Sequence, residues 1–363
     1  MSIEFIGKKF QIDSPWGRQE HYILKKLRQQ YDAFYPDQKQ LIISLTWYFS
    51  FTHDEVEKLI EMNKTYDRII WCSVSDPIPA GVPYYEISKR LGATDVLFYG
   101  SGFDIGVNTG VIACYDEFDL ENYSEDQVIL KQIENVYINY NRKPRPHRIR
   151  MVEGLIAAGL EQHGVITIGA ADVDYDITEG IEHNLVLTIE GDTPEDYLKC
   201  KNGDLPLDTN FGRVPYDILS LGKMNIWRGH FLNVVSETIC APWEPTFVTE
   251  KTWKPIVGMR PFVINGQPDV YNWLRTRGFR TFEKYYYGIE LENLHENHIQ
   301  TNIVQLVKKF CECSHDQLME IYNDMYDDLL YNRNRFFEYA QEEINNIENL
   351  DRNVLLNANR PNI

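Results

Sequence analysis

The segment 231–266 carries the residue types and spacings best suited to a ligand site. An apolar strand is predicted at Phe231–Ser236, and a short helix is predicted to begin after Thr249. Thr249 is a good N-cap because its hydroxyl can accept a hydrogen bond from a first-turn amide, and the helix dipole favours a carboxylate at Glu250. The segment therefore predicts a strand, a loop and a helix whose first turn presents a carboxylate followed by the ammonium of Lys251.

This arrangement fits a nucleotide that carries a diphosphate. Ligands of open α/β sheets bind outside the carboxyl ends of the strands, and helix N-termini attract phosphate groups. A diphosphate there would meet backbone amides and Lys251, while Glu250 could accept paired hydrogen bonds from the two vicinal hydroxyls of a ribose. Glu237, which follows the predicted strand, would contact the ribose or a sugar attached to the diphosphate. The alternative is a capped helix whose Glu250 and Lys251 are solvated surface charges.

The same segment resembles the donor-binding motif of the alpha-1,3-fucosyltransferase family and of related bacterial and phage glycosyltransferases. In that motif a strand ends in a polar pair, and a loop leads to Thr-Glu-Lys, a short helix, a glycine and a buried strand. The chain reads Ser236-Glu237-Thr238, Phe247-Val248-Thr249-Glu250-Lys251, Gly258 and Pro261-Phe262-Val263-Ile264-Asn265-Gly266. It departs from the fucosyltransferase pattern at Glu237-Thr238, in place of Asn-Ser, and at Trp253-Lys254-Pro255, in place of Asn-Ala.

The resemblance covers roughly residues 135–290 and includes a phage-like element at 274–282. It implies two Rossmann-like domains that face each other across a cleft (the GT-B fold), with the donor bound by the C-terminal domain. It also implies an inverting, metal-independent sugar transfer, with Glu250 and Thr249-Lys251 at the donor and an arginine at the leaving diphosphate.

A basic stretch supplies candidates for that arginine. Five Arg or Lys residues lie between Arg142 and Arg150, although the chain as a whole carries a formal net charge of −18. They follow a predicted strand and precede a predicted helix, so Arg142 and Arg148 could neutralise the leaving diphosphate. A solvated basic turn and a nucleic-acid contact are the alternatives, and non-specific groove binding would need more basic residues than these.

An inverting transferase also needs a carboxylate that takes the proton of the acceptor hydroxyl. The first half of the chain offers Asp76 and Asp104 after predicted strands, and His53 and Asp54 as weaker candidates. Each of them is also a common turn or cap residue. The glycines at 100, 102 and 106 depart from the dinucleotide-binding spacing, and Asp172-Val173-Asp174 lies in a predicted loop, so neither a dinucleotide nor a metal is expected.

The elements that would position these residues alternate between strand-like and helix-like stretches. Such alternation predicts βαβ units, and 363 residues predict two domains. We expect an N-terminal Rossmann-like acceptor domain at 1–140, a donor domain at 141–310 and C-terminal helices at 311–363. Apolar residues from Leu318 to Ile347 recur at helical spacing and predict the last of these helices.

Composition limits the function classes. The excess of 54 Asp and Glu over 36 Lys and Arg argues against a protein that coats nucleic acid. The apolar runs are of strand length, the N-terminus lacks an apolar leader, and the six cysteines show no metal-ligand spacing. These features predict a cytoplasmic protein with no membrane span.

The sequence therefore predicts a glycosyltransferase that takes a GDP- or UDP-linked sugar as co-substrate and needs no further cofactor. The acceptor would be a glycan hydroxyl or, as the alternative, a hydroxymethylated base in DNA. Two rival functions remain: a non-catalytic nucleotide-sugar binding protein, and an interaction protein that uses the Arg142–Arg150 stretch as a docking face.

Overall fold

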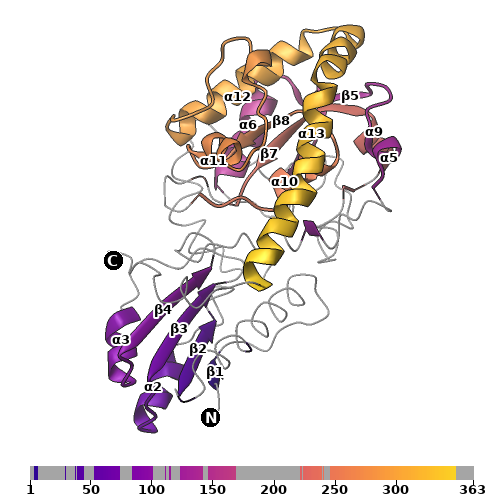
Figure 1. Cartoon of the computed structure of the whole chain (residues 1–363). Coiled ribbons are helices and arrows are strands. Elements are labelled where there is room, and N and C mark those ends of the chain that lie inside the picture. Colours follow the sequence, from indigo (N-terminus) through magenta and orange to yellow (C-terminus); the bar gives the residue numbers. More distant parts are fainter. Residues whose placement is uncertain are drawn as a thin grey trace. The chain divides into compact units, whose positions relative to one another are not determined.

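Strand-length apolar runs of the chain form two parallel β-sheets, each of four strands (Figure 1). The computed structural model describes residues 4–6, 29, 37, 39–44, 53–73, 84–100, 111, 114–115, 123–141, 146–168, 221–222, 224–238, 240 and 246–348. Contacts divide the chain into unit 1, Met1–Asp116 with Glu338–Ile363, and unit 2, Glu117–Phe337. The expected mixed α/β class with parallel sheets and C-terminal helices is confirmed.

The sheet of unit 1 runs in the order β1-β2-β3-β4, with every neighbouring pair parallel. Parallel neighbours need crossover connections, and helices supply them between the last three strands. The strands are β1 (Glu4–Ile6), β2 (Gln40–Ser44), β3 (Arg68–Ser73) and β4 (Asp95–Gly100), and the helices are α2 (His53–Glu61) and α3 (Tyr84–Arg90).

Helices α2 and α3 cover the same face of the sheet of unit 1. Leu41 and Ile43 of β2 alternate with Ile42, and they share one buried cluster with Ile87 of α3 and with Leu59 of α2. Ile42 points to the opposite face by the two-residue period of a strand and is buried as well. Both faces of this sheet are therefore covered, as is usual for parallel sheets.

The sheet of unit 2 runs in the order β6-β5-β7-β8, again with parallel neighbours. Its strands are β5 (Asn135–Asn141), β6 (Gly164–Ile168), β7 (His230–Ser236) and β8 (Phe262–Asn265). The first strand of the sheet, β5, lies in its interior. The chain moves from β5 to one edge through β6, and β7 then lies on the other side of β5 and leads to β8. The order thus reverses between β5 and β7.

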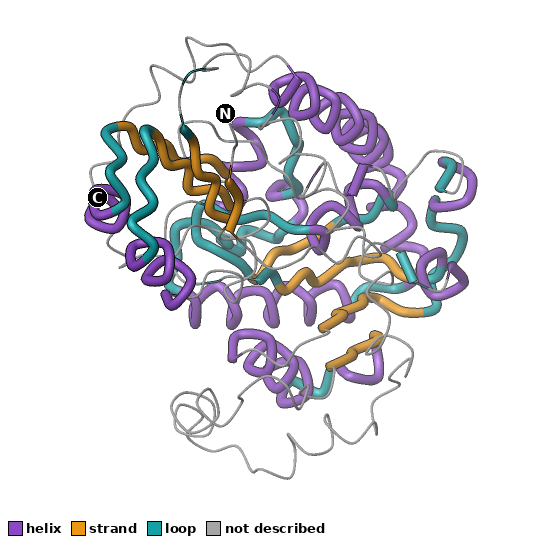
Figure 2. The backbone as a smooth tube through the Cα atoms, turned by 90° about the horizontal axis from the view of Figure 1, so that it is seen from below, coloured by secondary structure: helices purple, strands orange, loops and turns teal. Residues whose placement is uncertain are grey.

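Helices pack around this sheet, and both views show helices beside strands (Figures 1 and 2). Every described residue of β7 and β8 is buried. Helix α12 packs against α6 and the edge of β8, and it was not predicted from the sequence. The helices are α5 (Glu125–Val128), α6 (Pro146–Ala157), α9 (Met224–Arg228), α10 (Glu250–Val257), α11 (Val270–Thr276), α12 (Glu296–Cys311) and α13 (His315–Glu348), with 3₁₀ turns at Glu161–His163 and Glu283–Tyr285.

The contact units divide the chain at a different place from the expected domain boundary at residue 140. Strand β5 was placed at the end of the first domain, but it pairs with β6 and β7 and so begins the sheet of unit 2. The preceding segment also belongs to unit 2, where the amide of Leu130 donates to the Tyr322 hydroxyl at 3.2 Å. The boundary therefore lies between Asp116 and Glu117.

The C-terminal helices were expected at 311–363 as elements that pack on the domains, and the contact units divide this stretch between them. Helix α13 belongs to unit 2 up to Phe337, whereas the chain from Glu338 belongs to unit 1. The apolar residues predicted to share one face of this helix include Leu318, Met325 and Phe336, which are all buried. Among the described residues, no helix is both long and apolar enough to cross a membrane.

A fully buried histidine makes the stability of unit 2 sensitive to pH. The His230 ring packs edge-on against Trp227, and its Nδ1 lies 3.3 Å from the carbonyl oxygen of Ile226. Its Nε2 is buried and has no hydrogen-bond partner among the residues that the structure describes. Burial, together with the charge of Arg260, holds the pKa of His230 well below its ordinary value. The folded protein therefore keeps this ring neutral.

Protonation of His230 consequently favours the unfolded chain, where an ordinary histidine pKa of about 6.5 applies. The neutral ring contributes its full stability above that pH and loses about 1.4 kcal/mol for each pH unit below it, until the folded pKa is reached. Urea unfolding at pH 7.5 and 5.5 measures this loss. Between pH 7.5 and 5.5, the free energy of unfolding of a His230→Phe variant should fall by about 1.4 kcal/mol less than that of the wild type. Equal losses would contradict a neutral, buried His230.

Candidate functional site

The reversal of strand order in unit 2 places two helix N-termini at one edge of its sheet. Strand β5 leads to α6 on one side, and β7 leads to α10 on the other, so both helices begin beyond the carboxyl ends of adjacent strands. In open α/β sheets this switch point is where ligands bind. The residues predicted from 231–266 lie at this point, at the end of β7 and the start of α10.

Helix α10 begins as the sequence predicts. Thr249 is the N-cap with an extended backbone, and its hydroxyl accepts from the amide of Lys251 at 3.5 Å. Gly258 ends the helix at φ −84°, so a left-handed backbone is not the reason for this glycine. A Cβ at Gly258 would lie 2.2 Å from the Trp227 ring, whose Nε1 donates to the Gly258 carbonyl at 2.9 Å. The close approach of the indole therefore requires glycine.

Glu237 lies at the end of β7 as expected, but its carboxylate has partners other than a ligand. Its side chain is buried, and its two carboxylate oxygens accept four hydrogen bonds from unit 2 itself. Oε1 accepts from the amide of Thr249 at 3.1 Å and from the hydroxyl of Thr252 at 2.5 Å. Oε2 accepts from the Thr249 hydroxyl at 2.5 Å and from the amide of Thr238 at 3.0 Å. Since a carboxylate has about four acceptor sites, Glu237 holds the start of α10 rather than offering a free acceptor to a ribose.

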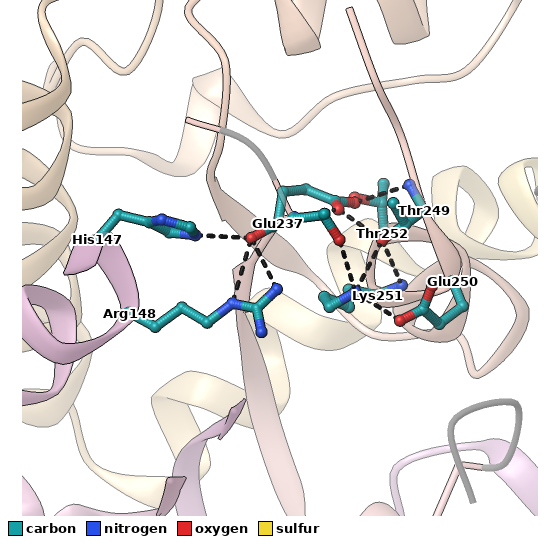
Figure 3. Close-up of polar contacts among 8 residues, drawn as sticks. His147, Arg148, Glu237, Thr249, Glu250, Lys251 and Thr252 are labelled. Carbon is teal, nitrogen blue, oxygen red and sulfur yellow. Dashed lines mark hydrogen bonds and ion pairs between the residues drawn. The ribbon is translucent and has the colours of Figure 1, made fainter. Parts of the chain in front are cut away.

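The backbone carbonyl of Glu237 ties the first turn of α6 to the same point. His147 Nε2 lies 2.7 Å from this oxygen, and Arg148 donates to it from Nε at 3.3 Å and from Nη2 at 3.0 Å. In Figure 3 His147 and Arg148 approach Glu237 from one side, and Thr249 and Lys251 lie on the other. Arg148 was expected in the stretch before the helix, but α6 begins at Pro146 and includes it.

Lys251 and Glu250 form an ion pair at the N-terminus of α10 (Figure 3). Lys251 Nζ lies 2.5 Å from Glu250 Oε1, and it also donates to the hydroxyls of Thr238 and Thr249, each at 3.1 Å. Burial opposes ionisation of Glu250, but the charge and hydrogen bond of Lys251, with the charge of Lys254, outweigh it. The pKa of Glu250 therefore lies below its ordinary value. The Glu250 carboxyl is therefore ionised at neutral pH.

A buried polar network underlies the site, and sequence reasoning missed it. Asn139 Nδ2 donates to the Val234 carbonyl at 2.7 Å, and Asn141 Nδ2 donates to Asn139 Oδ1 at 2.6 Å. Asn141 Oδ1 is buried without a partner among the described residues. The two asparagines alternate along the end of β5, so polar residues on one face of an otherwise apolar strand were the available signal.

A second part of this network joins α6, β8 and α12. The carbonyl oxygen of His147 accepts from Asn265 Nδ2 at 3.1 Å and from Gln300 Nε2 at 3.2 Å. Arg150, a member of the basic stretch, turns toward α12, where its Nε lies 3.4 Å from Gln300 Oε1. Burial lowers the pKa of Arg150. These contacts connect elements far apart in the chain, which no local pattern could predict.

The structure brings together five of the predicted donor residues: Arg148, Glu237, Thr249, Glu250 and Lys251. Asp76, Asp104 and Arg142 lie outside the described residues. The weaker candidates His53 and Asp54 belong to the first turn of α2. In the part of the chain that the structure describes, no three His, Cys, Asp or Glu side chains form a group that could hold a metal ion.

The arrangement has three chemical properties that a ligand could use. It offers a cation at Lys251, a charged carboxylate at Glu250, and the N-terminus of α10, whose first turn carries both. Cation and helix N-terminus both favour an anionic group. Comparison of the chain with protein-family models, with curated proteins and with solved structures finds no match.

Proposed function

We propose that unit 2 binds a nucleotide diphosphate sugar at the N-terminus of α10 and that the chain is a glycosyltransferase. The observation that carries this proposal is the position of Thr249-Glu250-Lys251, which stand at the switch point between β5 and β7 with a charged carboxylate and a cation side by side. A phosphate fits the cation and the helix N-terminus, and a ribose diol fits the carboxylate.

The proposed reaction is a displacement at the anomeric carbon of the sugar. The acceptor hydroxyl forms the new glycosidic bond while the bond from that carbon to the diphosphate oxygen breaks, and the nucleoside diphosphate leaves with the electron pair. The acceptor proton passes to a carboxylate of the N-terminal half, for which Asp76 and Asp104 are the candidates. Lys251 stabilises the charge that develops on the leaving diphosphate, and Arg142 would add to this.

Under this proposal the two units form the acceptor and donor halves of a GT-B enzyme. The donor is GDP- or UDP-linked, the reaction inverts the anomeric centre, and the acceptor is a glycan hydroxyl or a hydroxymethylated DNA base. Two α/β units with parallel sheets suit such a division of labour, and in unit 2 the order β6-β5-β7-β8 provides the required switch point.

Ligand-induced stabilisation tests the donor site. We expect GDP or UDP, in a panel with CMP, ADP and dTDP, to raise the melting temperature without a requirement for Mg²⁺. At a hundred times the dissociation constant the ligand stabilises the folded state by about 2.7 kcal/mol. Turnover of the matching nucleotide sugar with an acceptor then separates a transferase from a protein that only binds the donor.

Replacing Lys251 by methionine should weaken nucleotide binding about tenfold to a hundredfold, because a hydrogen bond from a charged group contributes about 1.5–3 kcal/mol. Methionine keeps most of the aliphatic stem and removes the ammonium. Lys284→Met is the matched control, since that lysine is exposed and lies 3.9 Å from Asp324. Isothermal titration of both variants measures the effect. If no nucleotide stabilises the wild type, or if both variants bind it equally well, the donor-site assignment is wrong.

A further inference from the structure

The ammonium of Lys251 has no spare donor. It carries three N–H groups, and it has three acceptors within hydrogen-bond distance, namely Glu250 Oε1, Thr238 Oγ1 and Thr249 Oγ1. Its side chain is 20% exposed, and that of Glu250 is 10% exposed. An anion that binds Lys251 must therefore displace at least one of these oxygens.

Glu250 is the acceptor that can leave. Thr249 is held in place, because it caps α10 and its hydroxyl also donates to Glu237 Oε2 at 2.5 Å. The Glu250 carboxylate, in contrast, has Lys251 as its one side-chain hydrogen-bond partner among the described residues. Glu250 Oε1 is also the closest of the three oxygens to Nζ, and it is the one that repels an incoming anion.

Displacement by a simple anion leaves Glu250 in an unfavourable state. The residue is 8% exposed, so its carboxylate would lose its ion pair with Lys251 where water reaches it poorly, and the charge of Lys254 would remain as partial compensation. An unpaired buried charge is strongly destabilising. A ligand with two vicinal hydroxyls avoids this cost, because its O–H groups can donate to the carboxylate as the phosphate takes Lys251.

We propose that the Glu250–Lys251 ion pair determines specificity: it excludes inorganic phosphate and diphosphate and admits ligands that combine a diphosphate with a free ribose diol. This inference rests on the proposed nucleotide-sugar function and names its ligand class more narrowly. Ribonucleoside diphosphates satisfy both halves of the pair. Inorganic diphosphate and 2′-deoxyribonucleoside diphosphates both satisfy Lys251. Inorganic diphosphate offers Glu250 no hydroxyl donor from a ribose, and the 2′-deoxyribonucleotide offers it one fewer.

The variant Glu250→Gln tests the inference, because the amide keeps the shape of the side chain and removes its charge. Isothermal titration at fixed salt and without Mg²⁺ measures the affinities for inorganic diphosphate, for GDP or UDP, and for its 2′-deoxy counterpart. We expect inorganic diphosphate to bind the variant at least tenfold more tightly than the wild type. The preference for the ribonucleotide over inorganic diphosphate should fall by at least the same factor.

Glu283→Gln is the matched control, since Glu283 forms an exposed ion pair with Arg275, 2.6 Å apart, on the same unit. It should leave every affinity unchanged. Glu250→Ser serves as a second variant, and melting without ligand verifies that each variant folds. If both Glu250 variants bind inorganic diphosphate no better than the wild type, the inference is overturned.

A separate measurement, the affinity of the wild type for GDP or UDP, tests the proposed function. Nucleotide binding without a gain of diphosphate affinity in the Glu250 variants keeps the donor site and overturns the selectivity role. If the Glu250 variants gain diphosphate affinity but the wild type binds no nucleotide, the ion pair excludes inorganic diphosphate, while the admission of ribonucleotides and the proposed function both fail.

Discussion

Replacing Glu237 by alanine should destabilise unit 2 by about 3–5 kcal/mol, measured as the free energy of unfolding in urea. The substitution leaves two amides and two hydroxyls without their acceptor in a buried place. Each unsatisfied buried group costs about 1–3 kcal/mol, and water entering the vacated space recovers part of that. The same change should weaken nucleotide binding, because Thr249 and the first turn of α10 lose their connection to β7.

Glutamine should rescue Glu237 only in part. Oε1 accepts one backbone amide, from Thr249, and Oε2 accepts another, from Thr238. In either orientation the glutamine NH₂ would face one of these N–H groups, so we expect Glu237→Gln to cost about 1–3 kcal/mol. Glu283→Ala, which removes an exposed carboxylate, should change stability by less than about 1 kcal/mol. A loss below 1 kcal/mol for Glu237→Ala would show that the carboxylate does not hold the helix.

The second large effect is expected at Trp253, one turn after Glu250 in α10. Its indole is fully buried among three aromatic rings, with centroids 5.4 Å from Phe279, 5.7 Å from Phe336 and 6.1 Å from Trp273. Trp253→Ala should lower the free energy of unfolding by about 3–5 kcal/mol, because the cavity loses apolar burial and packing on several sides.

Trp253→Phe distinguishes loss of volume from loss of a ring. It keeps an aromatic side chain in the cluster, so its cost should be smaller than that of alanine. Trp273→Ala is the comparison variant, since this tryptophan contacts Trp253 but is less buried. Urea unfolding of the three variants gives the order, and equal losses for Trp253→Ala and Trp273→Ala would contradict the role of Trp253 as the anchor of α10.

These two residues explain how α10 is positioned at the site. Glu237 binds its first turn, and Trp253 packs its middle into the core of unit 2. Trp253 lies where the chain departs from the fucosyltransferase pattern, and its burial gives that departure a packing reason. The neighbouring Glu250 and Lys251 thus stand on a helix that is fixed on two sides.

The sequence predicted the local elements of the site well. Patterns of three kinds were sufficient: an apolar run for β7, an N-cap threonine at Thr249 and a glycine at Gly258 for the two ends of α10. Each of these signals acts within a few residues of the backbone that it shapes, so no tertiary contact is needed to recognise it. The adjacent carboxylate and ammonium at 250 and 251 were predicted as separate ligand contacts, and their ion pair was not predicted.

Tertiary structure decided which of the predicted ligand residues instead form hydrogen bonds within the protein. Glu237 and Arg148 were predicted as ligand contacts from their residue types, but their partners come from α10 and from the end of β7. Gln300 of α12 likewise donates to the carbonyl oxygen of His147, which lies 153 residues earlier in the sequence. Contacts over such separations follow from how elements pack and leave no periodic trace in the sequence.

The domain boundary has the same explanation. The alternation of strands and helices predicted two α/β units, but it does not say to which sheet a strand belongs. The sequence pattern of β5 would be the same whether it ended the first sheet or began the second. Only its hydrogen bonds to β6 and β7 assign it to unit 2. The sequence by itself thus determined the elements, the capped helix and its charges. The pairing of strands and the burial of side chains decided the unit boundary and the role of Glu237, because both depend on partners distant in the chain.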